Sequence, residues 1–137
     1  MASKVQIGIN GFGRIGRITF RVIEEQYSDI LEVVAINDLV PVETNAHLLR
    51  YDSNYRAFPR KVEYDDKSIY VDGRPVRVFV EKDPAKIPWG DLGVDIVLEC
   101  TGVFTDGRKA AAHLEGGAKK VIISAPPSPE DLSLIHI

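Results

Sequence analysis

The spacing of apolar residues changes along the first 38 positions of the chain. Residues 5–9 alternate between apolar residues and glutamine or glycine, which predicts a short strand. From residue 14 to about residue 27 the spacing becomes helical. The apolar residues expected to share one face of that helix are Ile15, Ile18, Val22 and Ile23. A near-continuous apolar run at 31–36 is typical of a strand covered on both faces, so a right-handed crossover should make the two strands parallel neighbours.

The rest of the chain continues the alternation of strands and helices, with one interruption. Helices are predicted at 43–50 and 106–114, the second with Thr105 as N-cap and Gly116-Gly117 as its end. Strands of the buried type are predicted at 94–100 and 121–123. Between the helix at 43–50 and the strand at 94–100, three short segments alternate like antiparallel strands: 61–64, 68–71 and 76–80. The predicted fold class is α/β, a doubly wound parallel sheet with an antiparallel hairpin insertion turned by Asp72-Gly73.

Composition narrows the class of protein. The 137 residues are 45% hydrophobic, and their net charge is −3, with no basic block. This balance disfavours nucleic acid and anionic membrane surfaces as partners. Cys100 is the single cysteine and cannot form an internal disulfide, and the N-terminus lacks the pattern of a signal peptide. A cytoplasmic protein is therefore expected.

The candidate chemistry begins in the turn after the first predicted strand. Residues 11–16 read Gly-Phe-Gly-Arg-Ile-Gly, a G-x-G-x-x-G pattern placed between a strand and a helix. In this context Gly11 permits the tight turn, Gly13 lets the backbone approach a pyrophosphate, and Gly16 lets the helix pack closely on the strand. The backbone N–H groups around Arg14 and Ile15 would donate to the phosphates, aided by about half a positive charge from the helix dipole. The pattern predicts a dinucleotide-binding fold of the Rossmann type.

Asp38 completes the pattern and indicates which dinucleotide is bound. It follows the second predicted strand, 22 residues after Gly16, where a carboxylate can accept hydrogen bonds from the hydroxyls of the adenosine ribose. The same carboxylate would repel a 2′-phosphate, and the next residue, Leu39, carries no positive charge to offset it. NAD is therefore the expected cofactor in preference to NADP.

The chain also resembles a known family over residues 4–126, in unbroken order. Residues 9–17 (INGFGRIGR), 37–39 (NDL), 47–53 (HLLRYDS), 88–90 (PWG), 99–104 (ECTGVF) and 116–126 (GGAKKVIISAP) are similar to phosphorylating glyceraldehyde-3-phosphate dehydrogenases. The resemblance implies a two-domain, NAD-dependent subunit that forms homotetramers and oxidises an aldehyde in glycolysis. This chain resembles most of the N-terminal, NAD-binding domain. Erythrose-4-phosphate dehydrogenase shares the pattern and stays open as an alternative.

The resemblance implies a role for each matching position. Lys82 would lie beside the adenine, Thr101 and Gly102 would line the cofactor groove, and Ser124 would lie close to the nicotinamide ribose. The full expected cofactor-binding set is Asn10, Gly11, Phe12, Gly13, Arg14, Ile15, Gly16, Asp38, Lys82, Thr101, Gly102 and Ser124. No catalytic residue and no metal ligand is expected.

The family's catalytic machinery has no counterpart in this sequence. Its nucleophilic cysteine lies in a Ser-Cys-Thr-Thr-Asn segment, which is missing here, and its second domain is missing too. Cys100 is predicted to be a buried strand residue, and His47, His113 and His136 match no catalytic position. Basic residues at 56, 60 and 61 are predicted to form a solvated strand edge.

The end of the sequence departs from the family. The predicted organisation is an NAD-binding domain at 1–126, incomplete at its C-terminus, and a divergent tail at 127–137, with the catalytic domain absent. A truncated or frameshifted reading frame and a genuine short protein both fit this pattern. The expected function is NAD binding without catalysis; a non-catalytic module that docks on full-length subunits is the other possibility.

Overall fold

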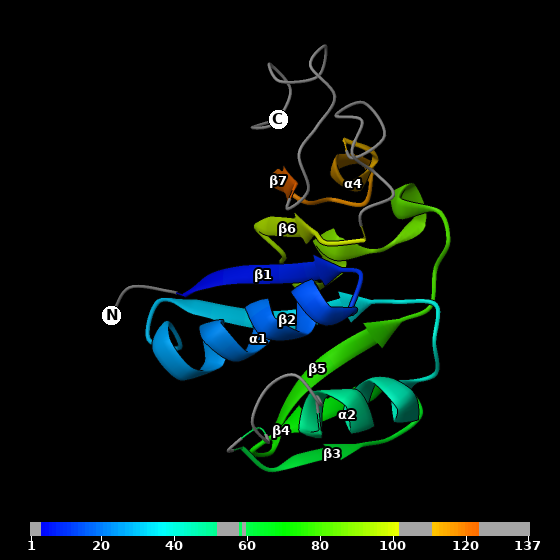
Figure 1. Cartoon of the computed structure of the whole chain (residues 1–137). Helices are drawn as coiled ribbons and strands as arrows, with labels where there is room; N and C mark the ends of the chain where they lie inside the picture. The colour runs from blue at the N-terminus through cyan, green and yellow to red at the C-terminus, as the bar shows by residue number, and fades with distance from the viewer. Residues whose placement is uncertain (1–3, 52–57, 59, 102–110, 124–137) are drawn as a thin grey trace.

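The computed structural model describes residues 4–51, 58, 60–101 and 111–123, and these residues form one seven-stranded sheet. Its strand order is β3-β4-β5-β2-β1-β6-β7 (Figure 1). The strands are β1 (Val5–Asn10), β2 (Leu31–Asn37), β3 (Val62–Tyr64), β4 (Ser68–Val71), β5 (Arg74–Phe79), β6 (Ile96–Glu99) and β7 (Lys120–Ile123). Among the described residues, the α-helices are α1 (Arg14–Gln26), α2 (Val42–Arg50) and α4 (Ala112–Glu115), and the short 3₁₀ helices are η1 (Pro84–Lys86) and η2 (Trp89–Leu92).

The pairing of the strands confirms the doubly wound α/β fold with an antiparallel insertion. Strands β5, β2, β1, β6 and β7 pair in parallel, and β3, β4 and β5 pair antiparallel. The chain first moves outward from β1 to β2 and β5, and then returns to place β6 on the other side of β1. The carboxyl ends of β2, β1 and β6 therefore lie together at the point where the winding reverses, the usual ligand site of such sheets.

The hairpin between β4 and β5 turns where the sequence predicts it. Asp72 and Gly73 have φ angles of 50° and 83°, and they alone separate the two strands. Two consecutive residues with positive φ are characteristic of the type I′ turn, whose twist suits a two-residue hairpin. The strand after the turn begins at Arg74, two residues earlier than expected.

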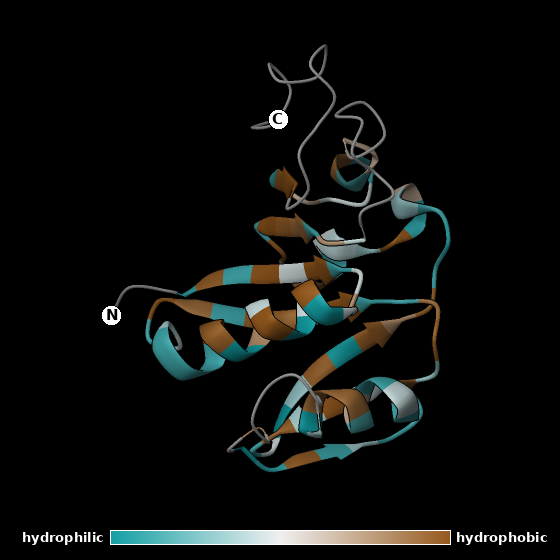
Figure 2. Cartoon of the chain, in the orientation of Figure 1, coloured by the Kyte–Doolittle hydropathy of each residue, from teal (hydrophilic) through white to brown (hydrophobic). Residues whose placement is uncertain are grey.

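Each face of the sheet carries its own apolar core, because neighbouring strand residues point to opposite sides. The larger core includes Ile7, Ile9, Val33 and Ile36 together with Phe20 of α1. The smaller core contains Trp89, Val97 and Val121 among others. Figure 2 shows apolar residues concentrated along the strands, and α1 in Figure 1 lies across β1 and β2. None of the helices in the described part of the chain is long and apolar enough to cross a membrane.

The expected apolar face of α1 is wrong in part. Ile15 is 54% exposed, whereas Gly16, Phe20 and Ile23 are buried. The helix is oriented by the contact of Gly16 with the preceding turn, and counting apolar side chains cannot register a glycine contact. The ring of Phe12, expected only as part of a tight turn, is also in the core and packs edge-on against Phe20 at 5.8 Å.

The second half of the chain agrees with the prediction where it is described. Most of the helix expected at 106–114 lies outside the described residues, and α4 ends at Glu115, one residue beyond the predicted end. Gly116 is its C-cap, and Gly117 follows with a φ of 105°. The tail at 127–137 lies outside the described residues as well.

Candidate cofactor-binding site

A cleft of about 450 Å³ lies at the carboxyl ends of the parallel strands, which is within the range of small-molecule sites. Its lining comes from the residues that end or follow β1, β2, β5 and β6. These residues are Asn10, Gly11, Gly13, Asn37, Asp38, Leu39, Glu81, Lys82, Cys100 and Thr101. A second hollow of about 350 Å³ lies against α2 and β3, and none of the predicted cofactor residues lines it.

Two glycines of the turn after β1 are required by close packing within the protein. Gly11 has a φ of 93°, and a Cβ atom placed there would lie 2.7 Å from the backbone nitrogen of Thr101. A Cβ atom on Gly16 would overlap the carbonyl oxygen of Gly11. The first glycine thus allows the turn to pass the end of β6, and the second brings α1 against the turn, as the motif predicts.

Gly13 differs from Gly11 and Gly16 because it lines the cleft and has open space beside its backbone. A Cβ atom built on it would meet no heavy atom within 4 Å, and its φ of −76° is accessible to any residue. Gly13 is the N-cap of α1, so no side chain caps the first turn of this helix. The backbone N–H groups there carry the positive end of the helix dipole, an environment that favours an anion such as a phosphate.

Asp38 lies immediately after β2 and is tied to the glycine turn. Its Oδ2 accepts the backbone N–H of Phe12 at 2.7 Å, and its Oδ1 accepts that of Leu39, also at 2.7 Å. Each carboxylate oxygen has a second acceptor position, so Asp38 can still receive hydrogen bonds from ribose hydroxyls. The structure therefore fixes the carboxylate beside the turn before any ligand binds.

A layer of buried polar side chains lies under the cleft, and most of it is missed by sequence reasoning. Asn37 donates from Nδ2 to Asn10 Oδ1 at 2.7 Å and to the Glu81 carbonyl at 2.9 Å, and its own Oδ1 accepts the Glu81 N–H at 2.9 Å. Glu99 Oε2 accepts the backbone N–H of Thr101 at 3.0 Å and its hydroxyl at 2.6 Å. The signal in the sequence is Glu99, one of two acidic residues that interrupt the apolar run 94–100.

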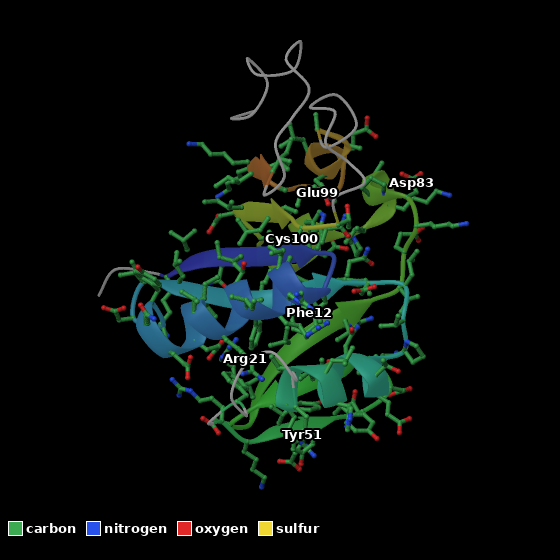
Figure 3. All side chains as sticks on the ribbon, viewed as in Figure 1. Phe12, Arg21, Tyr51, Asp83, Glu99 and Cys100 are labelled. Carbon is green, nitrogen blue, oxygen red and sulfur yellow. The ribbon has the colours of Figure 1, made fainter. Side chains whose placement is uncertain are left out.

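Burial raises the pKa of Glu99, but this effect is outweighed. Hydrogen bonds from His113, Thr101 and Asn10 favour the ionised carboxylate and leave the pKa below its ordinary value. Figure 3 places Glu99 and Cys100 at the end of β6, near the turn that contains Phe12. A charged and hydrogen-bonded carboxylate therefore underlies the cleft.

The structure brings six of the twelve expected cofactor residues together in the cleft: Asn10, Gly11, Gly13, Asp38, Lys82 and Thr101. Arg14 and Ile15 are exposed at the start of α1. Phe12 and Gly16 are buried behind the turn, so only the backbone of Phe12 lies near the cleft. Gly102 and Ser124 lie outside the described residues.

The cysteine, the histidine and the basic residues described next are not assigned a cofactor-binding role from the sequence, and each contacts other residues of the protein. Cys100 is half-buried, packs against the larger core and lines the cleft, so it is less buried than predicted. His47 lies on α2 against the ring of Tyr51. Arg60 lies 3.6 Å from the Asp72 carboxylate, and Lys61 lies 3.4 Å from that of Glu63. Residues 56 and 136 are outside the described ranges.

The parallel sheet, the glycine turn and the acid after β2 together define a dinucleotide-binding domain of the Rossmann type. Residues 5–107 match the family model described as the glyceraldehyde 3-phosphate dehydrogenase NAD-binding domain. The chain belongs to this family, and NAD is the cofactor of the domain.

Curated relatives agree over nearly the whole chain. Glyceraldehyde-3-phosphate dehydrogenase of Thermotoga maritima is 55% identical over 130 residues, which are 95% of this chain. Glyceraldehyde-3-phosphate dehydrogenase 1 of Streptomyces arenae is 56% identical over 131 residues, and the enzyme of Xanthobacter flavus is 52% identical over 132 residues, in both cases 96% of this chain. The match covers 39% of the length of each of these three relatives.

Proposed function

We propose that this chain binds NAD in the cleft at the carboxyl ends of β1, β2 and β6. The role of the bound NAD is that of hydride acceptor for an aldehyde dehydrogenase of the glyceraldehyde-3-phosphate type. The observation that carries the proposal is that Gly13, which has open space beside its backbone, and Asp38 line the same cleft. Gly13 would contact the pyrophosphate and Asp38 the adenosine ribose, which are the two contacts typical of a dinucleotide-binding site.

Each residue of the cleft then has a definite task. The backbone at Gly13, Arg14 and Ile15 holds the pyrophosphate, because its N–H groups begin α1 and no side chain caps them. Asp38 accepts the hydroxyls of the adenosine ribose through its remaining lone pairs. Lys82, which is exposed on the rim, lies beside the adenine.

The other end of the cleft would hold the nicotinamide half. Thr101 lines this end at the close of β6, and Asn10 at the close of β1. Gly102 and Ser124 belong to the same proposal through the family resemblance. NAD, when bound, supplies the hydride-accepting ring, and the chain contributes its orientation and a partly dehydrated environment.

We further propose that these 137 residues bind the cofactor without oxidising an aldehyde. The sequence contains no Ser-Cys-Thr-Thr-Asn segment. Among the described histidines, His47 lies on α2, and His113 is hydrogen bonded to Trp89 and Glu99. A mixture of the chain, NAD, phosphate and glyceraldehyde 3-phosphate should form no NADH. A cytoplasmic location is part of the proposal and rests on the single cysteine.

Calorimetric titration of the chain with NAD and with NADP tests the binding site. NAD should bind more tightly than NADP, and Asp38→Asn should weaken NAD binding by about ten-fold, because a charged acceptor is lost. The same variant should narrow the preference for NAD over NADP. Glu63→Gln is the control, since Glu63 is exposed on β3, away from the cleft, and its carboxylate lies 3.4 Å from the Lys61 amine. Equal NAD affinity in Asp38→Asn and the unaltered chain would contradict the proposal.

A further inference from the structure

A chain of buried hydrogen bonds runs under the cofactor cleft, from η2 and α4 on one side of β6 to the segment after β5. Its side chains are almost completely buried: Asn10 is 2% exposed, Asn37 4%, Glu99 1% and His113 0%. Trp89 Nε1 lies 3.0 Å from His113 Nδ1, and His113 Nε2 lies 2.7 Å from Glu99 Oε1. Asn10 Nδ2 lies 2.7 Å from the same Oε1 atom.

The donors and acceptors in this series of buried hydrogen bonds determine which nitrogen of His113 carries the proton. The indole N–H of Trp89 can only donate, so His113 Nδ1 must accept and carry no proton. The proton of His113 is then on Nε2 and points to Glu99. A ring protonated on both nitrogens would have no acceptor for Trp89, so the close contact between His113 and Glu99 is a neutral donor to a carboxylate.

Glu99 is the acceptor on which four donors converge. Oε1 receives His113 Nε2–H and the Asn10 amide, and Oε2 receives the N–H and hydroxyl of Thr101. An ionised carboxylate can accept all four, whereas a protonated or amide side chain would turn one donor group toward another. The four contacts therefore require a carboxylate at this position.

Two of those donors belong to residues that line the cofactor cleft. Asn10 and Thr101 both lie on its surface. The bond to Glu99 sets the orientation of the Asn10 amide, whose Oδ1 in turn accepts Asn37 Nδ2. Asn37 holds the backbone of Glu81, next to Lys82 on the rim of the cleft. One carboxylate thus connects the ends of β1, β2 and β6 and the segment after β5.

We propose that Glu99 is a positioning residue for the cofactor site, held by the Nε2–H form of His113, and that it acts on NAD through Asn10 and Thr101. This inference rests on the proposed function, because it takes the cleft to be the NAD site. Glu99 itself lies below the cleft surface and is not among the lining residues.

The test compares NAD affinity in Glu99→Gln, Ile69→Ala and the unaltered 137-residue chain. Glutamine keeps the size of Glu99 but cannot accept on its nitrogen, so either Asn10 and His113 or Thr101 loses its acceptor. We expect about ten-fold weaker NAD binding. Ile69, buried on β4 in the insertion, provides a control that lowers the melting temperature without touching the hydrogen-bonded chain.

A second measurement needs no variant of Glu99. The ¹⁵N chemical shifts of the His113 ring, assigned with His113→Gln, should show the Nε2–H form in the unaltered chain at neutral pH. The opposite form, with the proton on Nδ1, would overturn the proposal even if Glu99→Gln fails to fold.

The remaining outcomes separate the two proposals. If the unaltered chain fails to bind NAD, the proposed function is wrong and this inference falls with it. If the unaltered chain binds NAD but Glu99→Gln binds it within two-fold as well, the positioning role alone is wrong. If Ile69→Ala loses as much NAD affinity as Glu99→Gln, the loss in both variants reflects lower stability of the fold, and the inference is overturned.

Discussion

Alanine at Gly13 separates cofactor binding from folding. The added methyl group meets no protein atom within 4 Å, and the φ of −76° suits alanine, so the folded chain has room for it. Alanine is a poorer N-cap than glycine, which should cost at most about 1 kcal/mol, or about 4 °C in melting temperature. The methyl group would, however, occupy the space where a pyrophosphate approaches the backbone.

The expected loss of affinity follows from that displacement. A phosphate held off the N–H groups of α1 loses a hydrogen bond to a charged group, about 1.5 to 3 kcal/mol, which corresponds to about 10- to 150-fold in the dissociation constant. Calorimetric titration with NAD and a thermal melt on the same sample measure both quantities. NAD affinity within two-fold of the unaltered chain, with the melt preserved, would refute the placement of the pyrophosphate.

Gly16→Ala is the matched variant with the opposite expectation. Its methyl group would overlap the Gly11 carbonyl oxygen, which forces α1 away from the turn. Overpacking of this kind costs about 1 to 3 kcal/mol, partly offset by about 1 kcal/mol from the better helix propensity of alanine. Gly16→Ala should therefore lose both stability and NAD affinity, whereas Gly13→Ala should lose chiefly affinity.

Two further predictions concern stability. In Gly8→Ala the new Cβ would lie 2.6 Å from the Trp89 ring, so we expect a loss of about 1 to 3 kcal/mol and a change in Trp89 fluorescence; an unchanged melt would contradict this packing. The Gln6 N–H and Lys119 hold the pKa of Asp95 below its ordinary value of 3.8, so this carboxylate stabilises the fold above pH 3.8, and its contribution is lost as the pH falls through the lower folded value. Urea unfolding should show the unaltered chain more stable than Asp95→Asn near neutral pH and the two converging in acid; a difference independent of pH would refute this linkage.

The sequence predicts the frame of the cofactor site because the relevant signals are local. One strand-helix-strand unit contains all of these signals: the helical spacing of apolar residues from residue 14, the three glycines and the acid at position 38. The structure has this unit as expected. The Asp72-Gly73 turn is local in the same sense, since two adjacent residues with positive φ define it.

The sequence does not predict the series of buried hydrogen bonds under the cleft, because the residues that form it are distant in the sequence. Asn10 and Glu99 are 89 positions apart, and Trp89 and His113 are 24 apart, so no periodic pattern connects them. Glu99 appears in the sequence as an interruption of an apolar run, and His113 as an ordinary helix residue. Only the parallel pairing of β1 with β6 brings the two strand ends together.

The burial of α1 is the other partial failure, and it has a different cause. Apolar counting favours the face of Ile15, but the helix is held by its glycine contact, which turns Gly16 and Phe20 to the sheet. The residue left exposed, Ile15, lies at the start of α1 beside the proposed pyrophosphate site.

The most direct test of the account is a map of backbone amide shifts when the ¹⁵N-labelled chain is titrated with NAD. The account predicts saturable changes at Gly11, Gly13, Asp38, Lys82 and Thr101, around the cleft at the ends of β1, β2 and β6. It predicts no changes of that size at Glu43, His47 and Tyr64, which line the separate hollow against α2. Changes centred on that hollow, or none at saturating NAD, would contradict the central claim that the glycine turn and Asp38 form the cofactor site.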